Sequence, residues 1–167
     1  MFRRLLLLTL LALPLAVPLA VPLAALAQSP DPTGPQPTLP KEKLVIVTKD
    51  GSKHAFDVEL AATPKQQETG EMFRKSVPEN GGMLFVWDTP KQSEMWMKNT
   101  LVPLDMVFIK PDGTIDSIAE DTVPRSLKIV ASHGPVLATL ELAGGVTAKL
   151  NITVGDKVEA KQFGNAP

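Results

Sequence analysis

One short segment of the sequence contains residue types that bind small ligands. Trp96, Lys98 and Asn99 follow one another closely, and Asp105 comes after an apolar interval. A tryptophan offers a flat apolar surface with one N–H donor, and a lysine ammonium binds carboxylates and sugar hydroxyls. On an extended strand Trp96 and Lys98 share a face because side chains alternate. Together with Arg74, these residues form the predicted binding site, which suits an anionic or polar ligand with an apolar body.

A second interpretation makes the same residues determinants of the fold. Lys98 would then pair with Glu59 or Asp105, and Trp96 would fill the core. Paired polar groups near a core are commoner than ligand pockets. The sequence does not decide whether this segment is a site or a fold determinant.

Asp105 poses this choice most sharply because it lies between Leu104 and Met106 in an apolar run. Its carboxyl is either satisfied by Lys98, Arg74 or turn N–H groups, or it has a raised pKa and is a candidate acid or base. Pro103 just before it supports a turn and favours the structural role.

Two other chemistries, hydrolysis and copper binding, are compatible with the residues. A hydrolase acting on cell-envelope material would use Asp105 and Glu59 as acid and base. Glu141, also in an apolar run, raises the same question with less force. No nucleophile, phosphate-loop or metal-ligand motif of recognised spacing accompanies them. The sequence therefore favours a non-catalytic small-ligand or partner-binding module without a cofactor.

Copper is the remaining alternative. Met95 and Met97 would share one strand face and bind Cu(I) through their thioethers, with His54 or His133 as an imidazole ligand. Methionine more often fills gaps in a core, and the two histidines lie in unrelated segments.

The elements that must position these residues are mostly strands. Apolar runs and alternating patterns predict strands at 44–47, 54–60, 83–87, 94–98, 104–109, 114–119, 127–131, 136–142 and around 158. Thr63-Pro64-Lys65-Gln66 is a capping box that predicts a short helix ending at Gly70. Residues 144–150 fit one further helical turn. Many short strands at this spacing predict a compact, mainly β, antiparallel sandwich or barrel.

The N-terminal residues predict export. Arg3 and Arg4 precede an uncharged apolar run that ends in Ala25-Leu26-Ala27, the order of a secretory signal peptide over residues 1–27. Cleavage after Ala27 would leave no stable membrane insertion, although the run is long enough for an uncleaved anchor. A Pro-rich, semi-rigid linker is predicted at 28–41 and one domain at 42–167. We expect a periplasmic or secreted location.

Charge and cysteine content exclude several classes. Removing residues 1–27 takes away two basic residues and no acidic one, so 17 basic residues become 15 against 18 acidic, a net charge of −3. Such a surface argues against nucleic acid as a partner and leaves an unknown small ligand or envelope protein. The absence of cysteine excludes a thiol nucleophile and a thiolate metal site.

Motifs spread over the whole domain resemble those of the DUF192 family. They are Val58-Glu59-Leu60-Ala61-x-Thr63-Pro64, Gly70-x-Met72-Phe73-Arg74, Gly81-Gly82-Met83-Leu84-Phe85, Trp96-Met97-Lys98-Asn99-Thr100-x-x-Pro103-Leu104-Asp105, Leu140-Glu141-Leu142-Ala143-Gly144 and Gly155-Asp156. The resemblance implies a jelly-roll-like fold with a short helix, and no established activity. Two positions depart from the family pattern: Glu71 stands where an apolar residue is usual, and Met95 where an aromatic residue is common.

Overall fold

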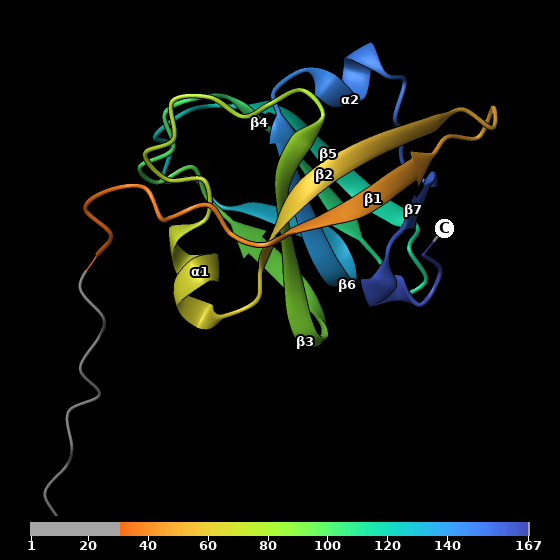
Figure 1. The fold of residues 1–167 in the computed structure, drawn as a ribbon, viewed down its shortest axis with the longest axis horizontal. Helices are drawn as coiled ribbons and strands as arrows, with labels where there is room; N and C mark the ends of the chain where they lie inside the picture. Colours follow the sequence, from red (N-terminus) through yellow and green to blue (C-terminus); the bar gives the residue numbers. More distant parts are fainter. Residues whose placement is uncertain (1–30, 167) are drawn as a thin grey trace, which may run out of the picture. The chain divides into compact units, whose positions relative to one another are not determined.

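The computed structural model describes residues 31–166, so the predicted signal peptide lies outside the described residues. Seven strands form one sheet in the order β5-β4-β6-β3-β2-β1-β7 (Figure 1). The elements are β1 (Lys41–Val47), β2 (Lys53–Ala61), α1 (Pro64–Thr69), β3 (Gly81–Met95), β4 (Leu104–Ile109), β5 (Ile115–Thr122), β6 (Val130–Ala143), α2 (Val146–Lys149), β7 (Lys157–Glu159) and the short 3₁₀ helix η1 (Lys161–Phe163). The predicted mainly β architecture with short helices is confirmed.

The sheet curls until its two edge strands meet at one end. Thr114, just before β5, forms a β-bridge with Lys157 of β7. The N–H of Val158 donates to the carbonyl of Gly113 at 2.8 Å. The result is a half-barrel whose concave face encloses the larger core.

One strand pair departs from the predicted antiparallel arrangement. β2 and β3 are parallel, with Glu59 opposite Met83. The long connection through α1 makes this possible, because parallel neighbours need a crossover whereas a tight turn joins only antiparallel ones. α1 is thereby placed beside the sheet.

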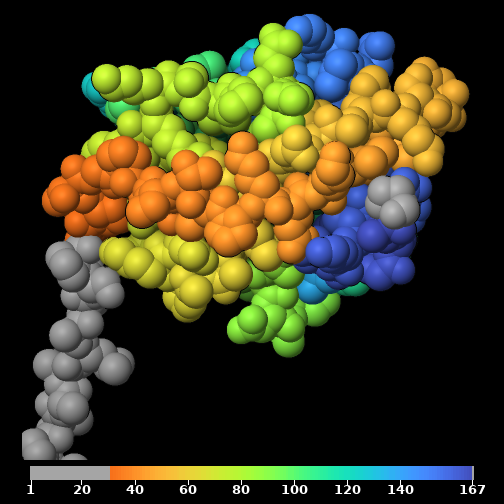
Figure 2. All heavy atoms as spheres, viewed as in Figure 1, coloured from red at the N-terminus to blue at the C-terminus, as the bar shows by residue number. Residues whose placement is uncertain are grey.

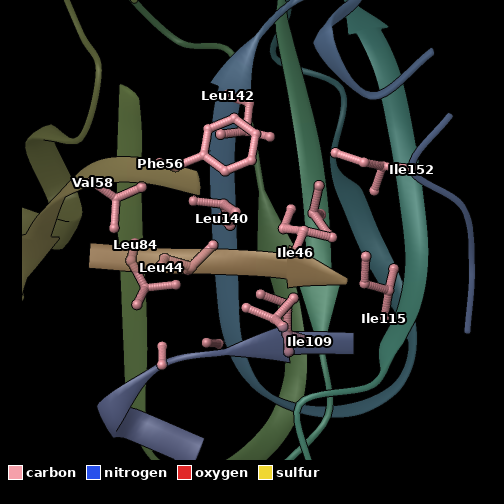
Figure 3. Packing of buried hydrophobic residues seen from close by; sticks show 14 of the residues in the cluster. Leu44, Ile46, Phe56, Val58, Leu84, Ile109, Ile115, Leu140, Leu142 and Ile152 are labelled. Carbon is pink, nitrogen blue, oxygen red and sulfur yellow. The ribbon is translucent and has the colours of Figure 1, made fainter. Parts of the chain in front are cut away.

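The two faces of the central strands pack against different clusters. The larger cluster includes Leu44, Phe56, Leu84 and Leu140 and fills the concave face (Figure 3). Residues that alternate with these, such as Phe85, belong to two smaller clusters on the other face of β3 and β6. The candidate site described below lies on this second face.

The helix α1 follows the local sequence signals. The N–H of Gln66 donates to Thr63 Oγ1 at 3.3 Å, and Gln66 Oε1 accepts from the N–H of Thr63 at 2.9 Å, which is the predicted capping box. The helix ends at Gly70, whose φ of 48° favours glycine. Glu71 therefore enters the turn that follows the helix, where it is buried.

The strand predicted at 94–98 is not a separate element. β3 runs from Gly81 to Met95 with two register shifts, and the chain then leaves the sheet. Met97 donates its N–H to the carbonyl of Ser126 instead of to a neighbouring strand. The predicted strand at 127–131 is likewise only the start of β6, which begins at Val130.

Residues 31–40, predicted as part of a linker, contact the domain. Gln36 donates to the carbonyl of Gly70 at 3.0 Å, and the N–H of Leu39 donates to Glu59 at 2.7 Å. Leu39 is buried. Figure 2 shows this segment in orange, spread across one face next to the yellow surface of α1. Within residues 31–166 no helix has the length and apolarity needed to cross a bilayer.

Candidate functional site

A row of side chains crosses the second face of the sheet. Glu59 lies opposite Met83, and Met83 lies opposite Glu141, so both carboxyls project on the same side. Arg74, from the loop after α1, forms two hydrogen bonds with Glu59, at 2.7 and 2.8 Å. Burial opposes ionisation of Glu59, but the bonds from Arg74 and Leu39 together lower the pKa of its carboxyl. Arg74 is thus held by Glu59.

Glu71 is the least satisfied polar group of this row. Its residue is 2% exposed, and Arg74 Nε lies 3.2 Å from Glu71 Oε2 without hydrogen-bond alignment. Neither Glu71 oxygen has a hydrogen-bond partner within residues 31–166. Burial raises the pKa of Glu71 to about 7, against the opposing charge of Arg74.

Glu141 on β6 has a similar environment. It is 4% exposed. Burial and the nearby Glu71 raise the pKa of its carboxyl well above the usual range, and Arg74 only partly opposes this. Two neighbouring carboxyls therefore hold protons at a pH where surface carboxyls have lost them.

Both carboxyls line a pocket of about 220 Å³ between α1, β3 and the segment after β3. Aromatic rings of Phe85, Trp87 and Trp96 contribute its apolar surface. We call it the tryptophan–glutamate pocket; it is lined by residues 67–72, Phe85, Trp87, Lys91, Glu94, Met95, Trp96, Thr100 and Glu141. The Trp87 indole N–H is buried and has no hydrogen-bond partner in the described part of the chain. Perturbed carboxyls and unpartnered polar atoms in an aromatic pocket mark a candidate binding site.

Trp96 and Lys98 lie together as predicted, although the strand ends before them. Lys98 Nζ lies 5.1 Å from the centre of the Trp96 ring and 2.9 Å from Asp31. Trp96 is 43% exposed and lines the pocket. The alternative in which Lys98 pairs with Glu59 or Asp105 and Trp96 fills the core is therefore wrong.

Asn99 connects the two loops beside the pocket. Its carbonyl accepts from the N–H of Phe73 at 2.9 Å, and its amide contacts the sulfur of Met72 at 3.8 Å. Phe73 and Asn99 both have a positive φ, of 62° and 58°. A bulky residue in that region is strained, and such strain clusters near functional sites.

Asp105 lies away from the pocket, fully buried on β4. Its carboxyl accepts from the N–H groups of Asp121, Gly145 and Thr147, at 2.8 to 2.9 Å, and from the Thr147 hydroxyl at 2.7 Å. It joins β4 to the turn before α2. The structural role, satisfied by turn N–H groups, is confirmed.

The methionines are distributed through the cores. Met97 is buried, and its sulfur accepts from the Thr122 hydroxyl at 3.1 Å. His54 lines a different pocket with Phe56, and His133 lies exposed in β6, where its N–H donates to Asp116. In residues 31–166 no three His, Cys, Asp or Glu side chains are arranged to hold a metal ion.

Three pocket residues were missed as site residues from the sequence. Glu71 was visible only as a departure from the family pattern, Glu141 as an acid in an apolar run, and Trp87 as part of a strand. Of the five predicted residues, only Trp96 lines the pocket. Lys98 lies over Trp96, and Arg74 and Asn99 hold the loops around the pocket.

The fold and the site define a curled β domain with an aromatic pocket over two buried carboxyls. The sequence pattern of DUF192, described as "Uncharacterized ACR, COG1430", matches residues 45–160, and the chain belongs to this family. A comparison with curated proteins found no match.

Two solved structures share the fold. A protein from Sinorhizobium meliloti 1021, described as a candidate transcription regulator, is 41% identical, with 76% of this chain and 98% of that chain covered and a TM-score of 0.74. A protein of unknown function from Novosphingobium aromaticivorans DSM 12444 is 36% identical, with 80% and 94% covered and a TM-score of 0.71.

Proposed function

We propose that this protein is an exported module that binds a small ligand in the tryptophan–glutamate pocket. The observation that carries the proposal is Glu71, a buried carboxyl whose oxygens lack hydrogen-bond partners among the described residues and which lines the pocket. A buried polar group without a partner costs about 1–3 kcal/mol. A ligand that satisfies it would recover that free energy on binding. The periplasmic or secreted location rests on the N-terminal sequence pattern.

The carboxyls first considered for catalysis do not line this pocket. Asp105 accepts four hydrogen bonds elsewhere, and Glu59 is held by Arg74. A hydrolase acting here would instead use Glu71, whose pKa of about 7 suits a general acid or base near neutral pH, and Glu141, whose pKa is also raised. That makes acid–base catalysis the second candidate function. Product formed from a bound envelope substrate, and lost in Glu71→Gln, would establish it.

The description of the Sinorhizobium protein does not favour regulation by DNA binding here. A DNA-binding face requires an excess of basic residues, and this chain has 17 basic and 18 acidic residues. A partner protein remains the alternative occupant of the exposed Trp96 surface.

Native and denaturing mass spectra test the proposal on the protein purified from its own host. We expect a non-covalent mass on the native protein that is lost on denaturation. It should be absent from Trp96→Ala and retained by Val154→Ala, which truncates an exposed apolar side chain outside the pocket. A bare polypeptide mass in every case, or an equal loss in both variants, would contradict the proposal. The intact mass also reports whether residues 1–27 have been removed.

A further inference from the structure

The row that crosses the second face of the sheet, formed by Glu59, Glu71, Arg74 and Glu141, contains three carboxyls and one cation. Arg74 forms its aligned hydrogen bonds with Glu59. Glu71 has only the unaligned contact with Arg74, and the charged groups that act on Glu141 are Glu71 and Arg74. This buried row is therefore short of positive charge whenever Glu71 ionises.

The aromatic walls already carry ammonium groups of the chain itself. Lys91 Nζ lies 4.1 Å from the centre of the Trp87 ring, and Lys98 Nζ lies 5.1 Å from that of Trp96. The faces of tryptophan rings attract cations. Lys91 of β3 lines the pocket together with Glu68 and Glu94, and all three are exposed to solvent. Ammonium groups thus contact the ring faces, whereas the charged groups that act on Glu71 and Glu141 include no ammonium among the described residues.

We propose that the ligand of this pocket is a small organic cation, an ammonium group on an apolar body, held against the tryptophan rings by the carboxylate of Glu71, with Glu141 beside it. This inference rests on the proposed function and names its ligand class. The sequence-based expectation of an anionic ligand came from Lys98, which in the structure pairs with Asp31. An anion would instead meet the buried carboxyls of Glu71 and Glu141 in the pocket.

Binding of a cation is coupled to proton release. Burial raises the pKa of Glu71 to about 7, and burial together with the nearby Glu71 raises the pKa of Glu141 well above its usual range. An ammonium ion favours their ionised form, so the proton passes to the solvent as the ligand binds. Arg74 favours the ionised form of Glu71 and Glu59 disfavours it, and the other charged groups that line its pocket are Glu68, Lys91, Glu94 and Glu141. A neutral polyol would leave this shortage of positive charge unchanged.

The pKa of Glu71 determines how strongly the affinity for the cation depends on pH. If the cation binds the form with ionised Glu71, the apparent affinity scales with the fraction of that form. With a pKa of about 7, that fraction rises about tenfold between pH 6 and pH 8.

Calorimetric titration tests the inference on the purified, host-processed protein. The probes are 2-phenylethylamine, its neutral analogue 2-phenylethanol, and methyl glucoside. We expect the amine alone to bind, about tenfold more tightly at pH 8 than at pH 6, with proton release shown by different heats in two buffers. Glu71→Gln should weaken amine binding at least tenfold and abolish its pH dependence, whereas Glu79→Gln, an exposed acid paired with Lys149, should change neither.

The outcomes separate this inference from the proposed function. If the alcohol or the glucoside binds as well as the amine, and Trp96→Ala abolishes that binding, the pocket is a ligand site but the cation inference is wrong. If amine binding is unchanged in Glu71→Gln, the carboxyl does not hold the cation. If no probe binds and the host-purified protein has no bound mass, both are overturned.

Discussion

Replacing Glu71 by Gln should stabilise the protein at alkaline pH. Glutamine keeps the size of the side chain but cannot ionise. The pKa of Glu71 rises from 4.5 to about 7 on folding because the carboxyl is buried. A tenfold change in an ionisation constant corresponds to about 1.4 kcal/mol, so ionised Glu71 destabilises the folded protein by about 3 kcal/mol.

The sign follows from proton binding. Between pH 4.5 and pH 7 the folded protein binds more protons at Glu71 than the unfolded chain, so stability falls as the pH rises through this window. The Gln variant lacks this loss. Its free energy of unfolding relative to the wild type should therefore increase by about 3 kcal/mol from pH 4.5 to pH 8.

Urea denaturation at several pH values measures this difference. Glu79→Gln, whose parent side chain is 75% exposed, serves as control and should show a nearly constant difference from the wild type. The opposing effect is the contact with Arg74 at 3.2 Å. If this ion pair outweighs burial, Glu71→Gln will lose stability at pH 8 relative to pH 4.5, and the reasoning is refuted. A difference that does not change with pH refutes it equally.

Two further predictions separate fold determinants from the site. Asp105→Asn replaces an acceptor of four hydrogen bonds by an amide with two donors, so it should cost about 2–4 kcal/mol of unfolding free energy in urea titrations. The control Asp57→Asn, at an exposed position, should cost little. The folded Asp105→Asn variant should still bind ligand, and a selective loss of binding would contradict the assignment of Asp105 to the fold. Arg74→Met should cost about 3–5 kcal/mol of unfolding free energy at pH 8 because it leaves Glu59 without its cation. Adding Glu59→Gln should recover part of that cost. A double variant as stable as the wild type would show that the pair contributes nothing to stability.

Local signals in the sequence predicted local structure well. The capping box of Thr63 and Gln66 lies within four residues, and the strands predicted at 44–47 and 54–60 fall within the neighbouring β1 and β2. Asp105 was also interpretable, because an acid within an apolar run must find partners and Pro103 indicated a turn.

The pocket was harder to predict because it depends on strand neighbours. Glu71 and Glu141 are 70 positions apart and meet only because β6 lies next to β3, which the sequence pattern does not specify. The sequence did not distinguish Trp87 from other aromatic residues in strands. The 15-residue length of β3, with its two register shifts, was hidden by polar residues that split it into two predicted strands.

The bridge between the ends of the sheet bears on how this protein behaves when it is concentrated. An unpaired strand edge invites strands from other molecules and so leads to aggregation. Here β7 is three residues long, and Lys157 both bridges to Thr114 and forms an ion pair with Asp112 at 3.0 Å. The backbone groups that meet there already satisfy each other. At this end, the described part of the chain offers no free backbone edge to which another strand could add.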